Sequence, residues 1–389
     1  MMKAELKLRL DSLAVFRDLL KDETVGALYG FLESGSVSDY AEFVSLLYKN
    51  SDGDLGRHVM TLCSRSENVY VKAVGMGKQP PECIKNSVKA ELQTLQMLAD
   101  LTPEELLKDC ENLQFLPGFA GEEVDIISEF EHRVQNIGKY GYGMYAGSHM
   151  FYIDENDHIV PVRNPDSITL DQLIDYEAQR QKVIDNTKAL LAGKPAANML
   201  LTGDAGTGKS STIKAVANAL HSEGLRIIEV RKEQLRAIPK ILDELAENPL
   251  KFILFIDDLS FLKDDDNFNA LKAVLEGSVS AKSKNVVIYA TSNRRHIIRE
   301  RFSDREGDDI HRNETMQEFV SLSERFGLHI TFQKPNKATF LHIVHSLAES
   351  EGIEMDTAEL ELLAERFALE RGGRSARLAR QFIDGLLSS

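Results

Sequence analysis

Residues 203–210 read GDAGTGKS, and this stretch decides the fold of the chain. It matches the pattern G-x-x-x-x-G-K-[ST] in full, between an apolar run at 198–202 and a helical segment at 210–220. In such a loop the glycines let successive backbone N–H groups point at a phosphate, and the following helix directs its positive end to the same place. The stretch therefore predicts a strand, a phosphate-binding loop and a helix.

ATP and Mg²⁺ are the expected cofactors of this loop. Lys209 would reach the β- and γ-phosphates, and the hydroxyl of Ser210 would coordinate Mg²⁺. The residues expected to bind the nucleotide here are Gly203, Asp204, Ala205, Gly206, Thr207, Gly208, Lys209, Ser210 and Ser211.

A second acidic signal follows the apolar run at 251–256, where the sequence reads KFILFIDDLSF. Ligands of open α/β sheets bind at the carboxyl ends of the strands, where Asp257 and Asp258 stand. Asp257 is predicted to hold the Mg²⁺ shell and Asp258 to activate the attacking water. Since Asp is one methylene shorter than the more frequent Glu, we expect hydrolysis to be slow or assisted by another group.

Further apolar runs at 225–230, 285–292 and 328–332 alternate with helical segments, which predicts an α/β fold with a parallel sheet between helical layers. The chain before about residue 102 has helical periodicity, including 13–20, and the chain after Pro335 is helical again. Runs at 150–153 and 158–162 predict a β-hairpin. The expected divisions are an N-terminal helical domain (1–135), a Gly/Tyr-rich connector with the hairpin (136–165), a nucleotide-binding core (166–334) and a helical lid (335–389).

These motifs resemble those of AAA+ ATPases from about Ile168 to the C-terminus. The phrase ATSNRR resembles the sensor 1 motif, which implies that Asn293 orients the attacking water. The phrase LSERFGL resembles box VII, which implies that Arg325 reaches the γ-phosphate held by a neighbouring subunit. The resemblance thus implies a homo-oligomer, a ring or spiral such as a hexamer, in which a monomer hydrolyses ATP poorly.

The C-terminal helices and the segment expected at the adenine also resemble those of the family. GGRSAR resembles sensor 2, which implies Arg377 as the lid arginine with Arg374 as the fallback, while Arg380 competes for the role. LDQLIDYEAQ resembles the segment that covers adenine, with Ile174 and Tyr176. The whole chain is similar to a bacterial AAA+ family of unknown function, domain of unknown function 815.

Composition limits the remaining choices. The 389 residues carry a formal net charge of −15, so wholesale coating of nucleic acid is not expected. The three cysteines form no disulfide or zinc pattern, and no stretch is apolar enough to span a membrane, so we expect a cytoplasmic protein.

Two basic segments leave the partner open. The loop with Arg231, Lys232 and Arg236 lacks the aromatic residue and the glycine with which protein-threading members of the family move polypeptides. These basic residues could contact nucleic acid, but a solvated helix start is the favoured interpretation. A run from Arg294 to Arg305 is expected to pair with acidic residues 263–267 of another subunit, with nucleic-acid contact as the second interpretation. The stretch from Phe302 is expected to order on assembly or partner binding.

Three functions remain. The first is an oligomeric ATPase that remodels or moves a protein or nucleic-acid client through the N-terminal helices. The second is a slow-turnover ATP-dependent switch that controls partner binding. The third, a small-molecule P-loop kinase, is disfavoured by Asn293, Arg325 and the helical lid together.

Overall fold

The computed structural model describes residues 2–108, 115–259, 261–262, 266–276, 284–293, 298–299 and 324–388. It divides into two compact units: Met1–Gly147 with Asn248–Leu250, and Ser148–Glu247 with Lys251–Ser389. In this described part of the chain, no helix combines the length and the apolarity needed to cross a bilayer.

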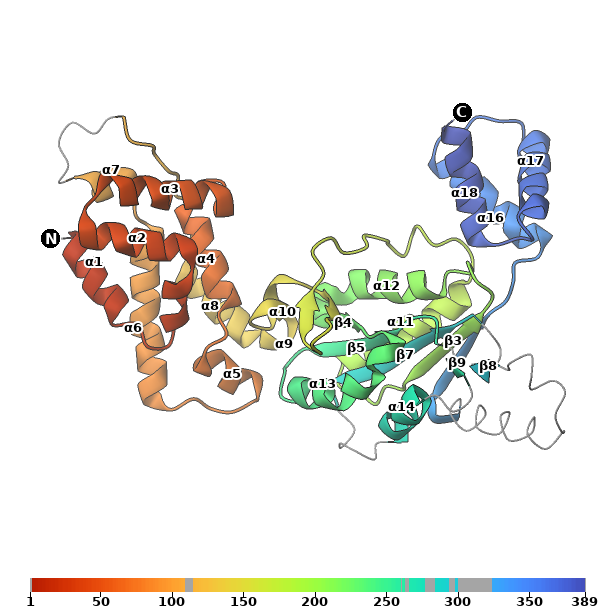
Figure 1. Ribbon diagram of the computed structural model, residues 1–389, viewed down its shortest axis with the longest axis horizontal. Helices are drawn as coiled ribbons and strands as arrows, with labels where there is room; N and C mark the ends of the chain where they lie inside the picture. The colour runs from red at the N-terminus through yellow and green to blue at the C-terminus, as the bar shows by residue number, and fades with distance from the viewer. Residues whose placement is uncertain are drawn as a thin grey trace. The chain divides into compact units, whose positions relative to one another are not determined.

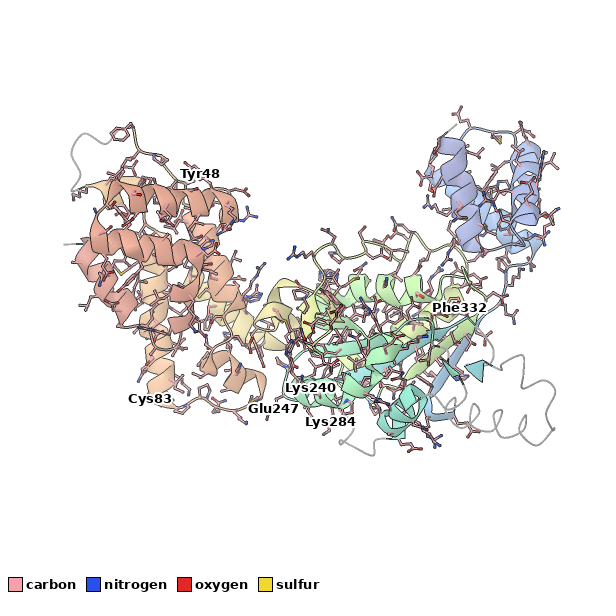
Figure 2. All side chains as sticks on the ribbon, viewed as in Figure 1. Tyr48, Cys83, Lys240, Glu247, Lys284 and Phe332 are labelled. Atoms are coloured by element: carbon pink, nitrogen blue, oxygen red, sulfur yellow. The ribbon has the colours of Figure 1, made fainter. Side chains whose placement is uncertain are left out.

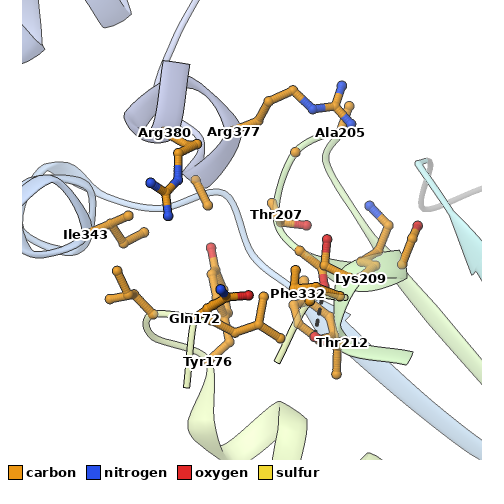
Figure 3. Close-up of a pocket in the computed structure, with 18 of the residues that line it drawn as sticks. Gln172, Tyr176, Ala205, Thr207, Lys209, Thr212, Phe332, Ile343, Arg377 and Arg380 are labelled. Atoms are coloured by element: carbon orange, nitrogen blue, oxygen red, sulfur yellow. Dashed lines mark hydrogen bonds between the residues drawn. The ribbon is translucent and has the colours of Figure 1, made fainter. Parts of the chain in front are cut away.

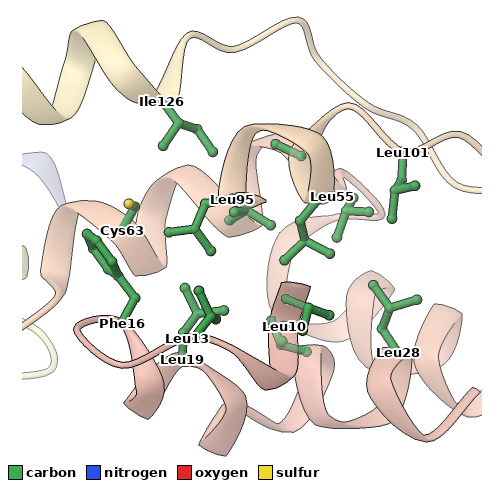
Figure 4. Packing of buried hydrophobic residues seen from close by; sticks show 14 of the residues in the cluster. Leu10, Leu13, Phe16, Leu19, Leu28, Leu55, Cys63, Leu95, Leu101 and Ile126 are labelled. Atoms are coloured by element: carbon green, nitrogen blue, oxygen red, sulfur yellow. The ribbon is translucent and has the colours of Figure 1, made fainter. Parts of the chain in front are cut away.

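The first unit is helical, as the sequence predicts (Figure 1). Its helices are α1 (Met2–Asp11), α2 (Glu23–Ser34), α3 (Val37–Ser51), α4 (Leu55–Arg65), α5 (Val69–Gly75), α6 (Glu82–Ala99), α7 (Pro103–Leu107), α8 (Ile126–Gln135), α9 (Ile137–Tyr140) and α10 (Met144–Gly147). Leu10, Phe16, Leu55 and Leu95 belong to its buried core, shown in Figure 4. Side-chain caps fix several helix starts, such as Asp22 at α2.

The helix expected over 13–20 is wrong: residues 13–16 are not helical, and only a 3₁₀ turn, η1 (Arg17–Lys21), follows them. The reason is the carboxylate of Glu91 on α6, which is 6% exposed. It accepts the backbone N–H groups of Ala14, Val15 and Phe16 at 2.9–3.1 Å. These amides are satisfied by a distant side chain and therefore need no helical carbonyl.

The second unit contains a seven-stranded sheet with the order β2-β1-β4-β5-β7-β3-β9. The strands are β1 (Met150–Ile153), β2 (Ile159–Pro161), β3 (Met199–Gly203), β4 (Leu225–Glu229), β5 (Lys251–Ile256), β7 (Val286–Ser292) and β9 (Leu328–Phe332). All neighbours are parallel except the β1–β2 pair. A separate pair, β6 (Phe261–Leu262) and β8 (Ile298–Arg299), is also parallel.

Helices cover both faces of the large sheet. Buried residues of α11 (Glu177–Leu191) and α12 (Lys209–Leu220) pack with Leu201, Ile253 and Tyr289 on one face. Figure 1 shows α13 (Ile238–Leu245) and α14 (Asp266–Glu276) on the opposite side of the strands from α12. The expected α/β core, a parallel sheet between helical layers, is therefore present.

The predicted β-hairpin is confirmed, but its setting differs from a separate connector. Phe151 pairs with Pro161 across the hairpin and, on its other side, with Ile228 of β4. The hairpin thus extends the edge of the large sheet, because a strand gains a second row of backbone hydrogen bonds by pairing on both sides.

The predicted C-terminal helices are also confirmed. They are α16 (Lys337–Ser350), α17 (Thr357–Glu370) and α18 (Ala376–Leu387), which bury a core of their own around Phe340 and Ile383. Asp356 caps α17 through the N–H groups of Ala358 and Glu359. Phe332, labelled in Figure 2, ends β9 shortly before this helical part.

Candidate active site

A cavity of about 610 Å³ opens beside the loop 203–208, below the C-terminal helices (Figure 3). Its walls come from four parts of the second unit: the loop and the start of α12, the ends of β5, β7 and β9, the segment before α11 with the first turn of that helix, and the helices α16 and α18. The residues that line it are Ile168, Gln172, Leu173, Ile174, Tyr176, Arg180, Ala205, Gly206, Thr207, Gly208, Lys209, Ser210, Ser211, Thr212, Asp257, Asp258, Asn293, Phe332, Ile343, Leu347, Ala376, Arg377, Arg380 and Gln381.

The loop follows β3 directly, and its glycines are required by close packing. Gly203 has φ +147°, and a Cβ there would lie 2.1 Å from the carbonyl oxygen of Phe332. Gly206 has φ +79°, and its Cβ would lie 3.0 Å from Cβ of Arg377 on α18. Only glycine fits both conformations without strain, because β9 and the start of α18 pack directly against the loop 203–208.

Lys209 is the first residue of α12 and is 4% exposed. Its ammonium group donates to the carbonyl oxygens of Gly203 and Asp204 at 2.8 Å and to Oδ1 of Asn293 at 3.0 Å. Burial lowers the pKa of Lys209, against the opposing effect of nearby carboxylates such as Asp257. An anionic ligand bound beside Lys209 would therefore supply a negative charge that favours the protonated form of this buried amine.

The two aspartates take different partners. The hydroxyl of Ser210 donates to Oδ1 of Asp257 at 2.6 Å, which places two hard oxygen ligands side by side. Mg²⁺ prefers such ligands, so this pair fits the predicted metal site. Asp258 has φ +50°, and its Oδ1 accepts the side-chain amide N–H of Asn293 at 2.7 Å.

The opposite end of the cavity is largely apolar. Ile174 and Tyr176 line it, and the Tyr176 ring lies 5.3 Å from the ring of Phe332. The Tyr176 hydroxyl donates to the carbonyl of Gln333 at 2.6 Å, and burial raises the pKa of this phenol to about 12. Sequence reasoning missed Ile343 and Leu347 here, because their helical spacing in α16 is equally typical of a helix core.

The structure separates the three competing lid arginines. Arg377 lines the cavity, and its backbone N–H donates to the Gly206 carbonyl at 3.2 Å. Arg380 also lines the cavity but forms an ion pair with Glu351 at 2.5 Å. Arg374 is held by Glu365 at 2.8 Å and is not one of the described cavity-lining residues.

Arg325 lies elsewhere in the second unit. Its Nε donates to Oε1 of Glu276, the last residue of α14, at 2.9 Å. Among the described residues that line the cavity, Arg325 does not occur. Arg325 is therefore held in an ion pair with Glu276 and does not line the cavity of its own chain.

The other basic segments are only partly described. Arg231, Lys232 and Arg236 are exposed around η3 (Lys232–Ala237). The side chains of the run from Arg294 to Arg305, the acidic residues 263–266 and the stretch from Phe302 lie outside the described residues.

Comparison with solved structures finds the following similarities. The Thermotoga maritima RuvB Holliday junction branch migration motor is 17% identical, with a TM-score of 0.38, over 56% of this chain and 63% of that chain. Two variants of the same RuvB have the same TM-score at 16% and 17% identity. The chain therefore spans less than two thirds of the length of these structures.

No curated protein matches the chain. A family model does match: residues 146–389 fit the family described as "Protein of unknown function (DUF815)". The matched segment covers the large sheet, the phosphate loop and the C-terminal helices. The chain therefore belongs to the DUF815 family.

Proposed function

We propose that this protein binds ATP with Mg²⁺ and hydrolyses it as an AAA+ ATPase. The observation that carries the proposal is the convergence of Lys209, the Ser210–Asp257 pair and the Asn293–Asp258 pair on one cavity next to the phosphate loop. The apolar end of the same cavity, at Ile174 and Tyr176, is suited to a purine base.

The residues have separate tasks in this reaction. Ser210 and Asp257 would hold Mg²⁺, which neutralises negative charge on the phosphate oxygens. Lys209 would exchange its loop carbonyls for the β- and γ-phosphates. Asp258 would accept a proton from water while the water oxygen bonds to the γ-phosphorus and the bond to the β–γ bridging oxygen breaks, giving ADP and phosphate.

The test compares Lys209→Ala with Asp258→Asn in the full chain. Lys209→Ala is expected to abolish ATP binding or turnover, because the phosphates lose their buried positive charge. Asp258→Asn is expected to bind ATP and to lose turnover, because an amide does not accept the proton. Full activity in Lys209→Ala would exclude the site, and full activity in Asp258→Asn would exclude this residue as the base.

We further propose that active sites are completed between subunits of a homo-oligomer, with Arg325 contacting the γ-phosphate bound to a neighbour. Its position outside its own cavity supports this role. Arg325→Ala is expected to keep nucleotide affinity and lose turnover; a loss of affinity would mean that the arginine acts within its own subunit. Specific activity should rise with protein concentration in parallel with the mass measured by light scattering.

A slow ATP-dependent switch is the second candidate. The short side chain of Asp258 and its bond to the Asn293 amide favour it, since both restrain the proposed base. A concentration-independent, very low turnover by a monomer would select the switch. Co-purification with the Asp258→Asn variant in ATP, compared with ADP, would identify the protein or nucleic-acid client that the remodelling function requires.

A further inference from the structure

Thr291, near the end of β7, contacts both aspartates of the site and is 1% exposed. Its hydroxyl donates to Oδ1 of Asp257 at 2.5 Å and accepts the backbone N–H of Asp258 at 3.0 Å. Its carbonyl oxygen accepts the N–H of Leu259 at 2.7 Å. One threonine therefore binds three consecutive residues of the turn that follows β5.

This turn is what allows two adjacent carboxylates to serve one cavity. Successive side chains of a regular strand point to opposite faces, so a continued β5 would direct only one aspartate to the site. Asp258 instead adopts φ +50°, and both Asp257 and Asp258 line the cavity. Aspartate adopts the left-handed region more readily than most residues, and here the Asp258 N–H in that conformation is bonded to Oδ1 of Asp257 and to the Thr291 hydroxyl, each at 3.0 Å.

The Thr291 hydroxyl stabilises this turn both as a hydrogen-bond acceptor and as a donor. As an acceptor it fixes the Asp258 N–H in the turn, and as a donor it orients the carboxylate that also accepts from Ser210. Since Thr291 is buried, water is poorly placed to replace either bond.

We propose that Thr291 is a positioning residue that sets the Mg²⁺-binding carboxylate of Asp257 and the catalytic carboxylate of Asp258 in their separate directions. The inference rests on the proposed ATPase function and deepens it. Residues that orient metal ligands typically contribute about 10–100-fold to metal affinity or activity, although they touch neither metal nor substrate.

The experiment compares Thr291→Val, which keeps the shape and removes the hydroxyl, with Thr291→Ser, which keeps the hydroxyl. Thr187→Val is the matched structural control. Thr187 is also fully buried in the second unit, and its hydroxyl bonds the Val183 carbonyl at 2.7 Å and the Tyr289 hydroxyl at 2.9 Å, away from the aspartates. Thermal unfolding of all three variants reports the general loss of a buried hydroxyl.

The first readout is binding of a fluorescent ADP analogue at varied Mg²⁺ concentration. In Thr291→Val the Mg²⁺ concentration for half-maximal enhancement of binding should rise by about tenfold or more. Thr291→Ser and Thr187→Val should stay close to the wild type. The second readout is steady-state ATP hydrolysis, in which Thr291→Val should lower kcat by about 10–100-fold with little change in KM.

A wild-type Mg²⁺ dependence in Thr291→Val would overturn the inference, as would equal effects of Thr291→Val and Thr187→Val. If Thr291→Val does not fold, Thr291→Cys provides the same comparison, because the cysteine side chain is similar in size to that of threonine and its thiol is only a weak hydrogen-bonding group. Failure of the wild type to hydrolyse ATP would refute the proposed function, whereas the Mg²⁺ dependence of nucleotide binding would still test Thr291.

Discussion

Replacing Gly206 by alanine tests whether the lid is packed directly on the phosphate loop. A Cβ at this position would lie 3.0 Å from Cβ of Arg377, 3.1 Å from Oγ of Ser375 and 3.3 Å from Cβ of Ser375. Gly208 has a similar backbone, φ +88° against +79°, but a Cβ there meets nothing within 4 Å. Gly208→Ala is therefore a matched control that shares the backbone strain and lacks the contact.

The magnitude follows from two contributions present only at Gly206. Overpacking a closely packed site costs about 1–3 kcal/mol. Moving the lid away to relieve it also weakens the bond from the Arg377 N–H to the Gly206 carbonyl, which contributes about 1 kcal/mol. Gly206→Ala should therefore weaken lid docking by about 2 kcal/mol or more relative to Gly208→Ala, which corresponds to roughly 30-fold in the opening equilibrium.

Hydrogen exchange of the peptide that contains the Arg377 amide measures this opening. Under conditions in which exchange reports the equilibrium, its rate should rise roughly 30-fold in Gly206→Ala relative to Gly208→Ala. Equal rates in the two variants would refute the reasoning, because the lid would then not depend on the close approach at Gly206.

Three further outcomes are expected. Burial lowers the pKa of Lys209 below its ordinary value of 10.5, and phosphate binding favours the charged form. Calorimetric ATP affinity should therefore fall as the pH rises, starting below 10.5; an affinity that stays constant up to that pH would contradict this. Glu91→Ala should lower the free energy of unfolding by about 3 kcal/mol or more in urea titrations, because three backbone amides lose their acceptor, and by less in Glu91→Gln, which keeps an oxygen; equal losses would refute it. Asp22→Ala removes the cap of α2 and a partner of His58, and should lower thermal stability at neutral pH by about 1–2 kcal/mol. Burial alone would raise the pKa of Asp22, but hydrogen bonds from His58 and the Val25 N–H bring it below 3.8. The difference in the free energy of unfolding between Asp22→Ala and the wild type should therefore persist above pH 3.8 and shrink only as the pH falls below that value.

Much of the second unit was predictable because its signals are local. The phosphate loop contains its glycines and its lysine within eight residues, GDAGTGKS, and short apolar runs on either side predict strands. The hairpin and the C-terminal helices follow from turn residues and caps such as Asp356. Asp257 and Asp258 could be assigned to the site because strand ends of a parallel sheet meet at one edge.

The sequence by itself determined the parallel α/β core, the helical front part, the hairpin and many of the residues that line the cavity beside the loop 203–208. The tertiary structure decided what depends on partners far along the chain. Glu91 prevents a helix at 14–16, and β4 takes the hairpin into the large sheet. Arg377 lies at the cavity while Glu365 holds Arg374 away, and Thr291 joins two aspartates more than thirty residues earlier in the chain. Periodicity and motifs indicate which face of an element is buried, but they do not indicate which distant polar group satisfies a buried hydrogen bond. These four features depend on which distant group forms that bond.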